Sequence, residues 1–114
     1  MSTSKITNDG IQNRSSAIDI ISGKISGGTS DELTLYKSGN VKTFKSSGVK
    51  FSSSASSWTD LMTLPSDCRP QSGTYGIMYN GTAGPAVVYI GASGNVQIAG
   101  ATADVAYLFC ISYI

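Results

Sequence analysis

The stretch that decides the fold is the end of the chain, Ala106-Tyr107-Leu108-Phe109-Cys110-Ile111-Ser112-Tyr113-Ile114. Aromatic and β-branched residues dominate it, which favours a β-strand. Chain ends are ordinarily polar and frayed unless the fold ties them down, so we predict a closing strand buried in a sheet. Strand alternation divides its side chains between two faces: Tyr107, Phe109, Ile111 and Tyr113 on one, Leu108, Cys110 and Ile114 on the other. Because both faces are apolar, cover is expected on both sides, from a second sheet, a helix or another subunit.

Short strand patterns separated by turn residues precede this run. Residues 33–36 and 41–44 flank Lys37-Ser38-Gly39-Asn40, a hairpin signal. Gly48 is expected to start another short strand at 49–51, and further strands are expected at 58–64, 74–79, 86–91 and 96–99. Strands that recur every eight to twelve residues with Gly and Asn turns are typical of an antiparallel sandwich or barrel. The sequence therefore predicts an all-β antiparallel fold.

The first thirty residues differ in composition from the rest. They are rich in Ser, Gly, Thr and Asn, and the apolar patch at 17–21 is too short for a stable helix by itself. We predict a neck, shaft or linker segment at 1–30 and a head domain at 31–114.

Composition excludes several classes of function. Only 13% of the 114 residues are charged and the net charge is +1. The six Lys and two Arg are scattered and do not interleave with aromatic residues, so no nucleic-acid partner is expected. No stretch approaches the ~20 apolar residues of a membrane span, so no membrane insertion is expected.

The residues that most often carry catalysis are missing. The chain has no His, which excludes Ser-His and Cys-His nucleophiles, and two Cys cannot complete a zinc site. No catalytic residue, metal site or cofactor is predicted, and the protein is not expected to be an enzyme. Cys110 is expected in the core and Cys68 in a loop, both as thiols, with a disulfide between them left open.

Several motifs in order carry a resemblance to a known family. Residues 58–65 read Trp-Thr-Asp-Leu-Met-Thr-Leu-Pro and run into Cys68-Arg69-Pro70; Val-Val-Tyr-Ile at 87–90, Ser-Gly-Asn-Val-Gln-Ile at 93–98 and the closing run follow. This set resembles the C-terminal head domain of tailed-phage fibre and baseplate proteins, and residues 33–44 are similar to that family's opening strands. Cys68 departs from the pattern, which more often has an aromatic residue before Arg-Pro.

The resemblance implies a jelly-roll-like β-sandwich head on a homotrimeric appendage of the virion. Its partners would be other tail or fibre proteins and a saccharide or another envelope component of the host surface. A purely structural trimerisation or capping domain of a viral fibre or capsid decoration is the alternative. A secreted lectin or adhesin is a third possibility.

Saccharide sites usually combine an aromatic platform with amide, hydroxyl and carboxylate groups, and the loop candidates for such a site are Tyr75, Tyr79, Asn80 and Asp104. A structural role is the favoured interpretation for each of them. Tyr75 and Tyr79 share a strand face with Ile77, which predicts core or interface positions. Asn80 is expected to shape a turn and Asp104 to be a solvated loop charge, and Trp58 is interpreted as a core anchor.

Overall fold

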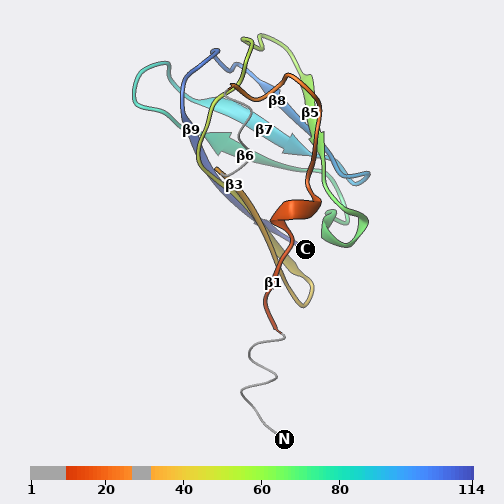
Figure 1. Cartoon of the computed structure of the whole chain (residues 1–114). Coiled ribbons are helices and arrows are strands. Elements are labelled where there is room, and N and C mark those ends of the chain that lie inside the picture. Colours follow the sequence, from red (N-terminus) through yellow and green to blue (C-terminus); the bar gives the residue numbers. More distant parts are fainter. Residues whose placement is uncertain (1–9, 27–31) are drawn as a thin grey trace, which may run out of the picture.

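The computed structural model describes residues 10–26 and 32–114 and consists of two antiparallel sheets with almost no helix (Figure 1). The four-stranded sheet has the order β1-β3-β4-β9, formed by Gln12–Asn13, Leu33–Ser38, Val41–Val49 and Tyr107–Tyr113. The five-stranded sheet has the order β2-β5-β8-β7-β6, formed by Asp19–Ile20, Thr59–Thr63, Asn95–Ala99, Ala86–Ile90 and Thr74–Met78. Two short 3-10 turns, η1 (Ser15–Ala17) and η3 (Ser66–Cys68), complete the elements. The predicted all-β antiparallel class is confirmed.

The β3–β4 hairpin forms at the predicted turn. Ser38 pairs with Val41, which leaves a two-residue loop, and Gly39 takes the positive φ of 59° that a type II′ turn needs at its first position. β4 then runs further than predicted. Gly48 does not begin a new strand but lies in a bulge of β4, where its φ is 144° and the pairing with β9 shifts register.

The last strand closes the fold as predicted, but with one buried face. β9 pairs with β4 from Tyr107 to Tyr113, and its side chains alternate strictly between buried and exposed. The inward face consists of the four aromatic and Ile residues predicted to share it. Leu108, Cys110 and Ile114 are exposed, so residues 10–26 and 32–114 do not supply the cover expected on their side.

One core lies between the sheets and draws on both of them. Phe44 and Phe109 meet edge to face with ring centroids 5.1 Å apart, and Phe51 lies 5.7 Å from Tyr107. Cys110 was predicted in the core but is exposed, so that prediction was wrong. Cys68 lies, as predicted, in the connection between β5 and β6, where it is fully buried, and both cysteines are free thiols. Cys110 shares a strand face with the polar Ser112, whereas η3 turns Cys68 into the core.

The two sheets are also joined along one edge. Tyr79, just after β6, and Leu108 of β9 exchange two main-chain hydrogen bonds of 2.8 Å. β6 lies close to β9 at Gly76, where an added Cβ would stand 2.6 Å from Ile111 Cδ1. Glycine at this position therefore permits the close approach.

The described part of the segment expected as a neck belongs to the two-sheet body. β1 pairs with β3, β2 pairs with β5, and Ile25 forms an isolated bridge with Phe51. Residues 10–26 thus supply an edge strand to each sheet. Each of these strands has only two residues, which is too short to show a strand periodicity in the sequence. The remainder of the 1–30 segment, 1–9 and 27–30, lies outside the described residues.

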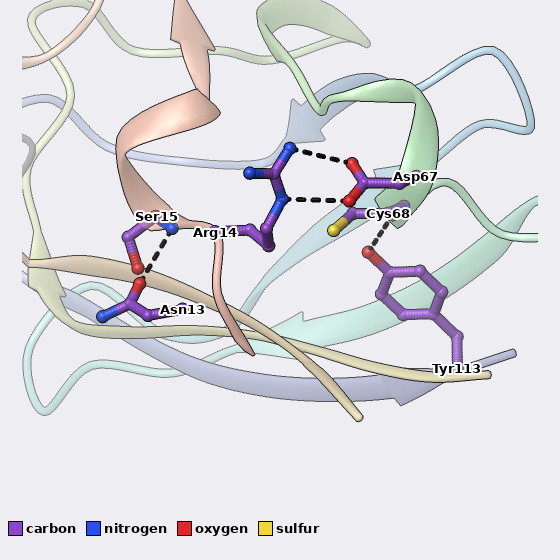
Figure 2. A network of polar contacts seen from close by, with 6 residues as sticks. All are labelled: Asn13, Arg14, Ser15, Asp67, Cys68 and Tyr113. Atoms are coloured by element: carbon purple, nitrogen blue, oxygen red, sulfur yellow. Dashed lines mark hydrogen bonds and ion pairs between the residues drawn. The ribbon is translucent and has the colours of Figure 1, made fainter. Parts of the chain in front are cut away.

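An ion pair attaches this segment to the β5–β6 connection (Figure 2). Arg14 Nε lies 3.0 Å from Asp67 Oδ2, and a second guanidinium nitrogen donates to Oδ1 at 3.1 Å. The hydrogen bond from Arg14 lowers the pKa of the Asp67 carboxyl, whereas burial raises the pKa of the adjacent Cys68 thiol. The hydroxyl of Tyr113 donates to the Cys68 carbonyl at 2.7 Å, and this tie holds the end of β9 against η3.

The two faces of the terminal strand predict opposite mutational costs. Ile111 is 6% exposed and Ile114 is 58% exposed. Ile111→Ala should lower the free energy of unfolding by about 2–5 kcal/mol because it opens a cavity between the sheets. Ile114→Ala, the matched control, should change it by less than about 0.5 kcal/mol. Urea unfolding at one fixed protein concentration measures both, and equal costs would contradict the assignment of the buried face.

Candidate functional site

The outer face of the five-stranded sheet carries a row of residues that crosses four strands. Tyr75 of β6 pairs with Tyr89 of β7, Tyr89 with Gln97 of β8, and Gln97 with Asp60 of β5. Paired residues of neighbouring strands point to the same side of a sheet. Because Val88, Val96 and Ile98 of the same strands are buried, this row points away from the core. The row therefore passes from aromatic to amide to carboxylate chemistry across the sheet.

Trp58 joins the aromatic end of this row. Its ring centroid lies 6.2 Å from that of Tyr75 and 6.1 Å from that of Tyr89, and the two tyrosine rings are 4.9 Å apart. The rings of Trp58 and Tyr75 therefore pack against each other. Both are also open to solvent, because Trp58 is 48% exposed and Tyr75 is 64% exposed. The interpretation of Trp58 as a core anchor was wrong. We call Trp58, Tyr75 and Tyr89 the aromatic cluster.

Gly73, just before β6, leaves room for the Tyr89 ring. A Cβ at Gly73 would overlap the Tyr89 hydroxyl and stand 2.8 Å from its Cζ. The ring therefore occupies the space that a side chain at position 73 would fill. The absence of a side chain at position 73 therefore lets the Tyr89 ring extend toward the start of β6 and pack against Tyr75, with the two rings tilted by 46°.

The polar end of the row is ordered by a hydrogen bond. Gln97 Nε2 donates to Asp60 Oδ1 at 2.8 Å, which fixes the amide and the carboxylate side by side. Asp60 stands two residues after Trp58, so both side chains leave the same face of the chain. An acceptor-rich pair thus lies next to an exposed aromatic surface.

An apolar strip continues from the cluster along the edge where the sheets join. Ile77 and Tyr79 are each 62% exposed, and Leu108 is paired with Tyr79 across the joint. The predicted face shared by Tyr75, Ile77 and Tyr79 exists, but it is not a core face. The core alternative for the two tyrosines was wrong, and an interface position remains a prediction. We call Ile77, Tyr79 and Leu108 the edge strip.

The other two candidates of the sequence have local structural roles. Asn80 is buried and shapes its own loop: its Nδ2 donates to the Gly84 carbonyl at 2.8 Å, and its Oδ1 accepts from the Thr82 N–H at 2.8 Å. Asp104 lies in the β8–β9 loop with a φ of 60° and accepts a hydrogen bond from Ser26 at 2.6 Å. The structure therefore does not bring Asn80 or Asp104 to Tyr75, and the favoured structural interpretation holds for both.

The opposite sheet carries a second candidate site. An open hollow of about 450 Å³ is lined by Ile11, which precedes β1, and by residues of β3, β4 and β9, namely Tyr36, Ser38, Thr43, Lys45 and Cys110. It lacks the contacting aromatic rings of the five-stranded sheet. Within residues 10–26 and 32–114, no three His, Cys, Asp or Glu side chains gather as metal ligands would, and no helix is long and apolar enough to cross a membrane.

Stacking and hydrogen bonding are the chemistry that this arrangement offers. Sequence reasoning named Tyr75 but missed Trp58, Asp60, Tyr89 and Gln97 as its partners. The spacing of Trp58 and Asp60 was the available signal, because a charged residue two positions away on a strand marks an outward face. No protein-family model matches the chain, and no curated protein matches its sequence.

Proposed function

We propose that this chain is the head domain of a phage tail fibre or baseplate protein, and that it attaches to a saccharide of the host surface through the aromatic cluster. The contact of three aromatic rings, two of them exposed, beside an amide–carboxylate pair is the observation that carries this proposal. The ordered motifs at 58–98 support the family, a jelly-roll-like topology, a place in the virion and other tail or fibre proteins as neighbours.

The chemistry of the face suits a sugar ring. A pyranose has an apolar face of C–H groups that can lie on an aromatic ring, and a rim of hydroxyls that need hydrogen-bond partners. Rigid aromatic side chains supply contact area at little cost in conformational entropy. Gln97 can donate and accept, while ionised Asp60 accepts only. The aromatic rings thus suit the C–H face of the sugar, and Gln97 and Asp60 suit its hydroxyl groups.

Assembly is the second function that a specific observation favours. The edge strip is apolar and exposed, and large exposed apolar patches commonly mark protein–protein contacts. Three copies related by a closed threefold axis would cover it on every chain. In the structural alternative, a trimerisation or capping domain without a ligand, the contact between copies of the chain would cover the aromatic cluster as well as the edge strip.

Removing one ring of the cluster should abolish attachment without disturbing the fold. We expect Trp58→Ala to weaken binding on a glycan array by at least about tenfold, a change of ~1.4 kcal/mol. Tyr36→Ala on the opposite sheet is the matched aromatic control and should leave binding unchanged. A blank array for the intact parent would contradict recognition and leave the structural alternative standing.

The edge strip predicts the oligomeric state. The parent should scatter light as three chain masses at micromolar concentration, and Ile77→Lys should dissociate it because a charge would enter a desolvated contact. Ile11→Lys changes an equally exposed Ile on the other sheet and should leave the trimer intact. A monomeric parent would contradict the trimer.

A further inference from the structure

The charged residues in the described strands of the five-stranded sheet have one sign. None of its five described strands contains Lys or Arg. Asp60 is exposed in β5, and Asp19 is exposed in the neighbouring strand β2. Lys37, Lys42 and Lys45 all belong to strands of the opposite sheet. A ligand that extends from the aromatic cluster along the row therefore meets the Asp60 carboxylate and no strand-borne cation.

The row is long enough to engage more than one sugar ring. Neighbouring strands lie ~4.8 Å apart, so the four residues from Tyr75 to Asp60 span roughly 14 Å. A ring on the aromatic cluster would place the substituents of the next unit over Gln97 and Asp60. The Asp60 carboxylate would then interact differently with neutral and with negatively charged substituents of that unit.

We infer that Asp60 makes this face select neutral saccharides and reject acidic ones that carry carboxylate, sulfate or phosphate groups; the inference rests on the saccharide recognition proposed above. A hydroxyl of a neutral sugar can donate to the Asp60 carboxylate, which only accepts. An acidic group in the same place has no proton to donate at neutral pH and repels the carboxylate. Discrimination by such a repulsive element is a general means of specificity.

A quaternary ammonium ligand is the main competitor, because aromatic rings beside a carboxylate also attract cations. Such a cation binds over ring faces within about 6 Å of each centroid, inside a cage of separated rings. Here the rings already touch, with the tyrosine centroids only 4.9 Å apart and the three planes inclined by 46° to 64°. The closely packed rings leave no open cage for a cation, whereas a single exposed ring face can still hold the C–H face of a sugar, which favours the saccharide.

Matched glycans and one isosteric substitution test the inference. The probes are oligosaccharide pairs that differ by a single acidic group, such as N-acetyllactosamine with and without terminal sialic acid, together with a choline-bearing conjugate. The parent should bind acidic members on the order of tenfold more weakly than their neutral partners. Asp60→Asn keeps the side-chain shape and should remove most of that difference. Asp104→Asn, the control for loss of one negative charge, should preserve it, since Asp104 lies in the β8–β9 loop.

Each remaining outcome is decisive. Trp58-dependent binding of acidic members as tight as that of neutral ones overturns the charge selection while leaving saccharide recognition intact. An Asp60→Asn protein that retains the full difference overturns the role of Asp60. Trp58-dependent capture of the choline conjugate in preference to every glycan overturns the neutral-saccharide class, and a parent that binds no glycan overturns the proposed function and this inference together.

Discussion

The packing of β9 against the core between the two sheets is the constraint on which the rest of the structure depends. The strand pairs with β4 along its whole length and meets β6 through the Tyr79–Leu108 pair, so it holds both sheets at once. Its inward aromatic and Ile side chains fill the space between the sheets. Since a strand side chain can take only one of two faces, a filled core leaves the opposite set outside. The same division holds in the five-stranded sheet: β6 and β7 turn one set of side chains into the core, and Tyr75 and Tyr89 lie on the outer face.

Alternation also explains which parts of the fold could be predicted. The terminal strand and the Gly39-Asn40 hairpin were predictable because their signals are local. Trp58 and Cys110 were misplaced because hydrophobic character was given more weight than position. Asp60 is two positions from Trp58, and Ser112 is two positions from Cys110, so each polar residue marks the face that the apolar residue shares. These polar residues would have corrected both assignments. Each error thus exchanged one face of a strand for the other.

Other features had no sequence signal. β1 and β2 contain two residues each, too few for any periodicity, and their places are determined by main-chain pairing with β3 and β5. β6 is similar: Tyr75, Ile77 and Tyr79 lie outside, while buried Met78 and the close packing at Gly76 lie inside. Apolar residues occur on both faces of this strand, so its orientation depends on contacts with β9 that are distant in the sequence. The candidate site could be only partly predicted for the same reason.

Low charge shapes both proposed activities. A face that binds by stacking and a few hydrogen bonds gains little from long-range attraction, so single-site affinity is expected to be modest. Three heads on one appendage would compensate through avidity, which can raise effective affinity by on the order of 10²–10⁴ without new contacts. The edge strip and the aromatic cluster would then serve one purpose, with assembly multiplying recognition.

The central claim is that the aromatic cluster lies on the surface, and the chain contains a single tryptophan with which to test it. Acrylamide quenching of Trp58 fluorescence measures the solvent access of this ring directly. Because Trp58 is 48% exposed, the structure predicts clear quenching by acrylamide in the folded protein, slower than in the urea-unfolded chain, with emission red-shifted from that of a buried indole. Blue-shifted emission that stays shielded from acrylamide until the protein unfolds would place Trp58 in a core or a subunit contact and contradict the claim.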